Sequence, residues 1–368
     1  MDGPFCDRDR ELKELISHAL NKANVVLYSP RRYGKTSLIR RVQKAVKEEG
    51  AITVYTDLFG VDSVESLANR IVTCLYSYCH SQEGLLKKAM KFLSIWRPVI
   101  KPDPEMGLSI TAETTAAKNG IELLDETLGL FGAFMKDHGS GFHVVLDEFQ
   151  EISELRESRQ IEGIMRSHIQ TQENASYFFV GSRRRLLLEI FNERKRPFYK
   201  SAINYALGPL PKDEAIIFIV SRFKSAGRRC PEETAERIYY RVGGYPYYLQ
   251  RIPYTMYELG DKKVTDATYE EALQEVVKEE EPYFQTKLEA LSVHQKRLLY
   301  ALSIEPTAAP FVISYMKRHN LASMGGARGA LKVLLALDYV ERHEDGQYRV
   351  VDPLFALYTS PLVQVSMG

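Results

Sequence analysis

The sequence is poor in cysteine. Its 368 residues include 4 cysteines, and no two of them form a CxxC pair or stand near a matching histidine spacing. Structural zinc sites need such paired ligands, and disulfide frameworks are typical of short secreted chains. The scattered thiols therefore predict a reduced, cytoplasmic protein without a disulfide scaffold or a zinc site.

A strong net charge and a long apolar run are also missing. The formal net charge is +1, so no overall field draws the chain to nucleic acid or anionic lipid. The longest apolar runs, such as 24–28 and 142–146, are far shorter than a bilayer span. The N-terminal segment 1–10 lacks the apolar stretch of a signal peptide. We therefore expect no membrane partner, and any nucleic-acid site has to be a local patch.

What the first half does contain is a series of short apolar segments that alternate with long helical patterns. Segment 35–49 has helical periodicity directly behind the first apolar run, and 97–115, with its prolines, is predicted to be an irregular insertion. Strands separated by helices of this length indicate an α/β fold, a parallel sheet with helices on both faces. The predicted strands are 24–28, 51–57, 142–147, 176–181 and 203–207.

The second half, after Leu210, shows helical patterns without a strand until near its end. These patterns are interrupted at Gly227 and at Gly243–Gly244, and the glutamate run 279–281 is interpreted as a solvated helix end before Pro282. Three short helices are then predicted at 295–303, 309–320 and 327–337, followed by a hairpin that turns at Asp345–Gly346. This is the order of a winged helix. The predicted domains are 1–210, 211–280 and 281–368.

One stretch, SPRRYGKTSL at 29–38, nearly spells a phosphate-binding loop. It follows a predicted strand and opens a predicted helix, and a helix N-terminus presents free N–H groups to phosphate oxygens. Gly34 lets the backbone approach the phosphates, Lys35 would reach the β- and γ-phosphates, and Thr36 would ligate Mg²⁺. Ser29 stands where the motif usually has its first glycine, and because serine is small we expect it to be tolerated.

A second motif, HVVLDE at 143–148, is an apolar strand that ends in two acids. Ligands of parallel sheets bind at the carboxyl ends of the strands, so Asp147 and Glu148 are expected near the phosphate loop. Asp147 can hold Mg²⁺ through water, and Glu148 can orient or deprotonate the attacking water. An Asp–Glu pair alone is also a common helix cap, but the two motifs together predict a P-loop nucleotide-binding protein.

Polar residues also follow the next predicted strand. Ser182 is a candidate for contact with the γ-phosphate or the water, and capping of the following helix is the alternative. Arg183, Arg184 and Arg185 form a basic cluster at the same edge. We take Arg183 as the candidate arginine finger, with a solvated cluster as the alternative for the others.

Four stretches of the chain resemble the prokaryotic, mainly archaeal, ATPases of the STAND branch of the AAA+ superfamily. They are FCDRDREL at 5–12, PRRYGKTSL at 30–38, LDEFQ at 146–150 and GGYPYYLQ at 243–250. The resemblance implies that Arg8 lies near adenine and ribose, although Asp7 replaces the usual glycine, and that Pro246 of a helical lid lies against the base. It also implies a switch in which the lid and winged helix close over ADP and open on exchange for ATP.

The sequence thus predicts an ATP-binding and slowly hydrolysing ATPase that acts as a nucleotide-controlled switch, with ATP/ADP and Mg²⁺ as cofactors. A second copy of the chain or another protein is expected as a partner in the ATP state. DNA is a further candidate through the basic residues Arg328, Lys332, Arg342 and Arg349 of the winged helix. The alternative function is a DNA-binding or scaffold protein that uses the nucleotide as a structural ligand.

The predicted site residues fall into three groups. The nucleotide-binding residues are Arg8, Ser29, Pro30, Arg31, Arg32, Tyr33, Gly34, Lys35, Thr36, Ser37 and Pro246. The catalytic residues are Lys35, Glu148, Ser182 and Arg183. The metal ligands are Thr36 and Asp147.

Overall fold

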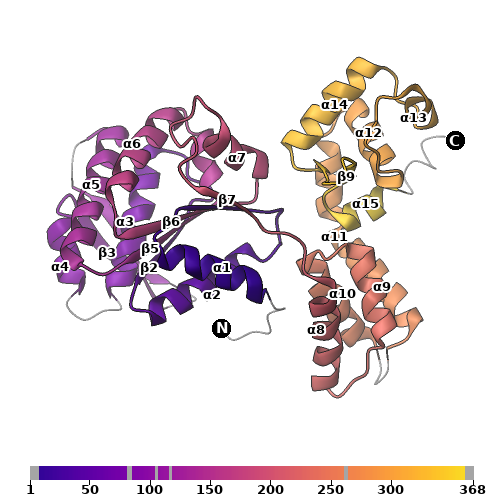
Figure 1. The fold of residues 1–368 in the computed structure, drawn as a ribbon, viewed down its shortest axis with the longest axis horizontal. Helices are drawn as coiled ribbons and strands as arrows, with labels where there is room; N and C mark the ends of the chain where they lie inside the picture. Colours follow the sequence, from indigo (N-terminus) through magenta and orange to yellow (C-terminus); the bar gives the residue numbers. More distant parts are fainter. Residues whose placement is uncertain (1–7, 81–84, 104–106, 116–117, 261–263, 361–368) are drawn as a thin grey trace. The chain divides into compact units, whose positions relative to one another are not determined.

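A parallel five-stranded sheet forms the framework of the N-terminal half (Figure 1). Its strands lie in the order β2-β5-β6-β1-β7, and all neighbours run parallel. The central strands β5 and β6 are buried along their whole length, whereas the edge strand β2 alternates and β7 is mostly exposed. Continuous apolar runs are typical of central parallel strands covered on both faces. The strands are β1 (Val25–Tyr28), β2 (Ile52–Asp57), β5 (Phe142–Asp147), β6 (Ala175–Gly181) and β7 (Ile203–Ala206).

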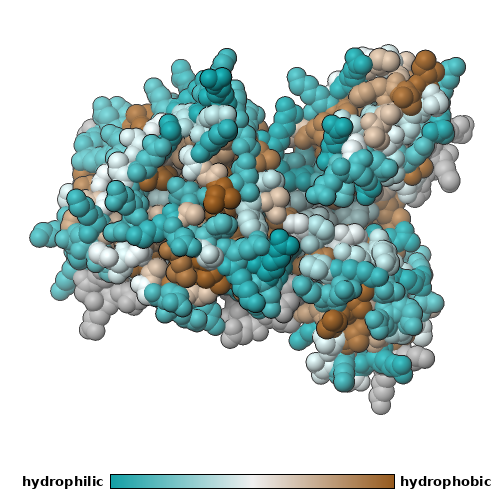
Figure 2. Space-filling model, viewed as in Figure 1, coloured by the Kyte–Doolittle hydropathy of each residue, from teal (hydrophilic) through white to brown (hydrophobic). Residues whose placement is uncertain are grey.

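The computed structural model describes residues 8–80, 85–103, 107–115, 118–260 and 264–360. They divide into two compact units. The sheet unit comprises 9–31 and 35–207. The helical unit comprises the C-terminal part from Gly208, together with Arg8 and the short segment 32–34. On the face drawn in Figure 2, hydrophilic side chains cover most of each unit.

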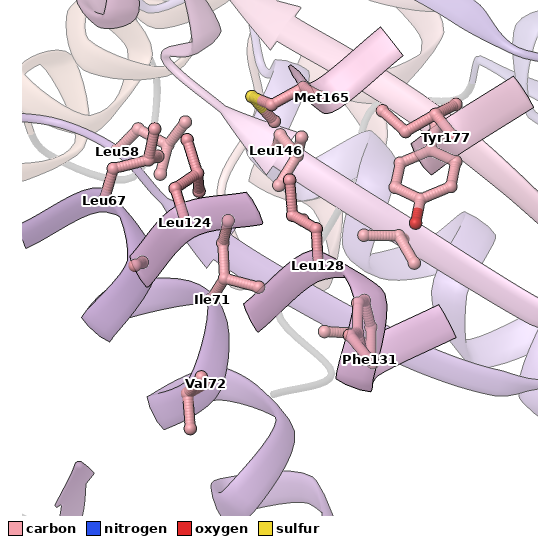
Figure 3. Packing of buried hydrophobic residues seen from close by; sticks show 14 of the residues in the cluster. Leu58, Leu67, Ile71, Val72, Leu124, Leu128, Phe131, Leu146, Met165 and Tyr177 are labelled. Atoms are coloured by element: carbon pink, nitrogen blue, oxygen red, sulfur yellow. The ribbon is translucent and has the colours of Figure 1, made fainter. Parts of the chain in front are cut away.

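Helices cover both faces of the sheet, as the alternation of the sequence predicts. On one face, α3 contacts β2 and α5, α5 contacts α6, and Leu128 of α5, Leu146 of β5 and Met165 of α6 belong to one buried cluster (Figure 3). On the other face, α2 contacts β2 and β5, and α1 contacts β6. The helices of this unit are α1 (Asp9–Leu20), α2 (Lys35–Glu48), α3 (Val64–His80), α4 (Leu85–Phe92), α5 (Gly120–His138), η1 (Phe149–Glu154), α6 (Ser158–Thr171) and α7 (Arg184–Asn192).

The prediction of an irregular insertion at 97–115 is wrong, because this segment forms an antiparallel ribbon. Its strands are β3 (Trp96–Asp103) and β4 (Gly107–Thr114). Pro98 lies opposite Ala112, whose N–H and C=O bond outward to side chains of α3. A proline is tolerated in a strand where its missing N–H would face away from the partner strand. Each strand of a two-stranded ribbon has such a free edge, so the prolines do not break it.

The helical unit begins with α8 (Lys212–Ser225), α9 (Glu232–Val242), α10 (Pro246–Leu259) and α11 (Asp266–Glu289). Gly243 and Gly244 have φ of 57° and 74° and end α9, and Pro246 occupies the first turn of α10. Left-handed glycines followed by a helix-starting proline make the sharp elbow that the sequence predicts. The glutamate run is not a solvated helix end: α11 continues through Pro282, and Glu280 is only 7% exposed.

A winged helix completes the chain, in the order that the sequence predicts. Three helices precede an antiparallel hairpin, and Gly346 in its turn has a φ of 81°. Ser292 caps the first of these helices through a capping box and Ser323 caps the third, which satisfies free N–H groups. None of the helices described is both long enough and apolar enough for a membrane span. The elements are α12 (Val293–Ile304), α13 (Ile313–Arg318), α14 (Met324–Ala336), β8 (Val340–Arg342), β9 (Tyr348–Val350) and α15 (Pro353–Thr359).

Candidate active site

The phosphate loop connects β1 to α2, with Lys35 as the first residue of the helix. Gly34 has a φ of 81°, a region that glycine enters without steric cost, so this position of the motif requires its glycine. Arg32 also has a positive φ, of 61°. Among the described residues, Ser29 is not one of those with a positive φ, so a residue with a side chain can adopt its backbone conformation without strain. Serine in place of the usual first glycine is therefore compatible with the turn.

The Lys35 side chain lies inside the loop. Its Nζ donates to the carbonyl oxygens of Ser29 at 3.2 Å and Pro30 at 3.1 Å. The residue is 6% exposed, and burial lowers the pKa of the ammonium to about 8, with the charges of Glu148 and Asp147 acting in the opposite direction. A buried ammonium with two acids nearby is well placed to bind phosphate oxygens.

Asp147 ends β5 and accepts hydrogen bonds at both carboxylate oxygens. Its Oδ1 accepts from the N–H of Glu148 at 2.9 Å. Its Oδ2 accepts from the Thr36 hydroxyl at 3.3 Å and from the Tyr55 hydroxyl at 2.5 Å. Burial raises the pKa of this carboxyl. The structure therefore brings the two predicted metal ligands together, and their hydroxyl and carboxylate oxygens are the donors that Mg²⁺ prefers.

Glu148 has a left-handed backbone, with φ 50° and ψ 40°. Few non-glycine residues adopt this conformation, and such strain is commonly retained at functional sites. The Glu148 carboxylate accepts from the Ser182 hydroxyl at 3.0 Å and 2.9 Å and from the Ser182 N–H at 3.2 Å. Since β5 and β6 are neighbours, the two residues that follow them meet at the carboxyl edge of the sheet.

Arg183 lies beside these groups but is engaged in ion pairs. Its guanidinium contacts Glu151 at 2.7 Å and Glu154 at 2.9 Å, both on η1. An arginine finger at this position would have to leave these partners, and its role stays a prediction. Arg185 is exposed on α7.

Several predicted nucleotide-binding residues belong to the helical unit. Arg8 is 2% exposed and donates to the carbonyl oxygens of Gly208 at 2.9 Å and Tyr33 at 3.3 Å. The Tyr33 ring meets Tyr245 edge-on at 4.8 Å. Pro246 is buried at the start of α10. The predicted segment before Arg8 lies outside the described residues.

Arg32, also in the helical unit, has partners within that unit. Its guanidinium pairs with Glu280 at 2.8 Å and lies 4.2 Å from the centre of the Tyr247 ring. Tyr247 donates to the same carboxylate at 2.8 Å. Arg31, Thr36 and Ser37 are exposed along the loop.

Two residues at the site have no role in the sequence-based prediction. Tyr55 lies in the middle of β2, two residues before the strand ends, and no signal in the sequence marks it, because its place beside Asp147 depends on the pairing of β2 with β5. Gln150 is 1% exposed and donates to Glu148 at 2.5 Å. It belongs to the LDEFQ motif, but nothing in the motif says which way its amide points.

Two family models match the chain. A family model described as an ATPase domain predominantly from Archaea matches residues 5–252, and one described as a probable winged helix domain matches 282–360. No curated protein matches the chain.

Solved structures share the fold at low sequence identity. The chain is similar to the Walker-type ATPase PABY2304 of Pyrococcus abyssi, with a TM-score of 0.69 and 18% identity over 96% of each chain. It is also similar to the ORC2 protein of Aeropyrum pernix, determined as ADPNP–ADP complexes, with a TM-score of 0.58 and 14% identity over 99% of this chain and 96% of the other.

Proposed function

The chain belongs to the family of ATPase domains found predominantly in Archaea, and we propose that it is a Mg²⁺-dependent, slowly hydrolysing ATPase of the STAND/AAA+ type that acts as a nucleotide-controlled switch. One observation carries the proposal. At the carboxyl edge of the sheet, hydrogen bonds join four of the predicted site residues, Thr36, Asp147, Glu148 and Ser182, and the ammonium of Lys35 lies in the adjoining loop. Together they supply a phosphate-binding cation, metal ligands and a base.

The loop and its helix bind the phosphates. The N–H groups at the start of α2 face phosphate oxygens, and the Lys35 ammonium exchanges its two loop carbonyls for β- and γ-phosphate oxygens. Thr36 and Asp147 would hold Mg²⁺, which when bound neutralises charge on those oxygens. Tyr55 orients the Asp147 carboxylate from the neighbouring strand.

Glu148 is the proposed base for hydrolysis. The oxygen of a water molecule bonds to the γ-phosphorus, and the bond from this phosphorus to the β,γ-bridging oxygen breaks. ADP leaves with that electron pair, and the proton of the water passes to the Glu148 carboxylate. Ser182 holds the carboxylate through its hydroxyl and its N–H.

The switch role rests on the family and on the C-terminal half. Arg8, Pro246 and the winged helix would respond to the bound nucleotide, with an ADP-bound resting state and an ATP state that recruits a second copy or another protein. The complexes of the Aeropyrum pernix ORC2 protein with ADPNP and ADP support both nucleotides as ligands of this fold.

The nucleotide content of freshly purified, denatured protein tests the proposal. We expect tightly held ADP in the wild type and none in Lys35→Ala, because the substitution removes the ammonium charge that contacts the phosphates. Lys44→Ala, which removes an exposed lysine from the same helix, should retain the ADP. An empty wild-type protein that also fails to bind ATP in a titration would contradict the assignment of the site.

A second candidate function is DNA binding by the winged helix. Arg328 and Lys332 lie on the exposed face of α14, a helix without acidic residues. The wing is less suited to phosphate contacts, because Arg349 bonds to Asp345 and Gln347. Fluorescence anisotropy with duplex DNA tests this second function. An affinity for DNA that falls with salt and is lost in Arg328→Ala/Lys332→Ala would favour it.

A further inference from the structure

Gln150 is a buried amide directly beside the proposed base. It is 1% exposed and belongs to η1, which starts immediately after Glu148. Its Nε2 donates to Glu148 Oε2 at 2.5 Å, a short hydrogen bond to a carboxylate. Hydrogen bonds to ionised acceptors are the strong ones, so this contact restrains the Glu148 side chain.

The other end of the Gln150 amide lies against Gly181, the last residue of β6. A Cβ at position 181 would be 2.0 Å from Gln150 Oε1, much closer than any real contact allows. Gln150 Oε1 itself is buried and has no hydrogen-bond partner in the described chain. Gly181 therefore gives the amide the space to point its nitrogen at Glu148.

The bonds to Glu148 are unevenly distributed between its two oxygens. Oε2 accepts from Gln150 Nε2 and from the Ser182 N–H, and the Ser182 hydroxyl, which has one proton to donate, lies 2.9 Å from Oε2 and 3.0 Å from Oε1. Within the part of the chain that the structure describes, Oε1 accepts only from the Ser182 hydroxyl. Since each carboxylate oxygen has about two lone-pair sites, Oε2 is saturated and Oε1 keeps the capacity to accept a proton.

We propose that Gln150 is a positioning residue for ATP hydrolysis: it saturates Oε2 of Glu148 and fixes the carboxylate so that Oε1 faces the attacking water, with Gly181 making room for the amide. This inference rests on the proposed ATPase function and on Glu148 as its base. Gln150 itself touches neither the nucleotide nor the water in this arrangement; it acts through Glu148.

Gln150→Met tests the inference, because methionine keeps the length of the side chain and removes the donor. We expect kcat for ATP hydrolysis to fall about tenfold, a fraction of what a general base contributes, while KM for ATP stays at the wild-type value. Gln160→Met, at an exposed glutamine of α6, is the matched control and should leave kcat unchanged. A wild-type kcat in Gln150→Met, or a raised KM with unchanged kcat, would overturn the inference.

A double-mutant cycle separates positioning from general packing. Gly181→Ala should push the amide away and lower kcat to the level of Gln150→Met. Gln150→Ala removes the amide and leaves Leu187 Cδ2, at 3.1 Å, as the atom nearest to a Cβ at position 181, so adding Gly181→Ala to it should lower kcat much less than Gly181→Ala does alone. Independent effects of the two substitutions would contradict the role assigned to Gly181, and thermal unfolding of each variant checks that the fold is retained.

The same assays distinguish this inference from the proposed function. A wild-type protein that binds no ATP, or binds it without turnover, removes the proposed function and the inference together. A wild-type protein that hydrolyses ATP, with Glu148→Gln inactive and Gln150→Met fully active, removes only the role of Gln150.

Discussion

The hydroxyl of Tyr55, on the edge strand β2, donates a 2.5 Å hydrogen bond to Oδ2 of Asp147 at the end of β5. The same oxygen accepts from Thr36 at 3.3 Å. A phenol thus orients the carboxylate that is the proposed metal ligand, and burial together with this carboxylate raises the pKa of the phenol, which keeps it protonated as a donor.

Tyr55→Phe should weaken the use of Mg²⁺ while leaving the fold intact. Groups that orient a metal ligand typically contribute tenfold or more to metal affinity, so we expect the Mg²⁺ concentration for half-maximal ATP hydrolysis to rise about tenfold. Measuring the ATPase rate against Mg²⁺ concentration checks this. Tyr199→Phe is the control, and equal Mg²⁺ dependence in Tyr55→Phe and wild type would exclude the role of Tyr55.

Glu148→Gln should bind ATP normally and stop its turnover. The amide keeps the shape of the side chain but cannot take a proton, so we expect kcat to fall about 10²- to 10⁴-fold. ATP titration and phosphate release give binding and turnover separately. Glu173→Gln, at an exposed glutamate, should behave as the wild type; turnover at the wild-type rate in Glu148→Gln would remove this residue from the mechanism.

Lys35 should make the stability of the nucleotide-free protein depend on pH. Its pKa falls from 10.5 to about 8 on folding. Between these values the unfolded chain holds the proton and the folded chain does not, so the stability contributed by Lys35 rises with pH over this window. Below pH 8 Lys35 is protonated in both states. Its buried charge then lowers the free energy of unfolding by about 3 kcal/mol, the free energy that corresponds to the shift in its pKa.

Lys35→Met removes that buried charge. We expect the variant to exceed the wild type in free energy of unfolding at pH 7, and this advantage to shrink towards pH 10.5. Chemical denaturation of both proteins across this range measures the difference, and Lys44→Met should show no such pH dependence. An advantage that is constant with pH would contradict the shifted pKa.

Arg196 neutralises a fully buried carboxylate in the sheet unit. It lies 3.0 Å from Glu162, whose side chain is 0% exposed, and burial raises the pKa of Glu162 to about 7. Arg196→Met removes the nearest counter-charge, and because a carboxyl with a pKa near 7 can take up a proton at pH 8, we expect the free energy of unfolding to fall by about 1–2 kcal/mol at that pH. The loss should be smaller at pH 6, where Glu162 is protonated. Arg194→Met, at an exposed arginine, is the control; equal stability of the two variants would contradict the ion pair's role.

Much of the fold follows from local patterns. The apolar runs ending at Tyr28, Asp147 and Gly181 predict strands within about one residue of those observed, a normal margin for element ends. The hairpin turn at Asp345–Gly346 and the elbow at Gly243–Gly244 were equally predictable, because both depend on glycines with positive φ. The β3–β4 ribbon was not predictable from its prolines. A proline shows that one backbone N–H is missing, but not whether that N–H would have faced a partner strand.

The sequence by itself determined the phosphate loop, the acids that end β5 and the order of the elements, because each depends on neighbours along the chain. Only the tertiary structure decided that Tyr55 meets Asp147, that Gln150 fits against Gly181 and that the buried Glu280 pairs with Arg32. These contacts depend on strand order and on packing between distant segments. A short range of sequence carries no record of which strand becomes its neighbour, so the groups that orient the two site acids appear only once the chain has folded.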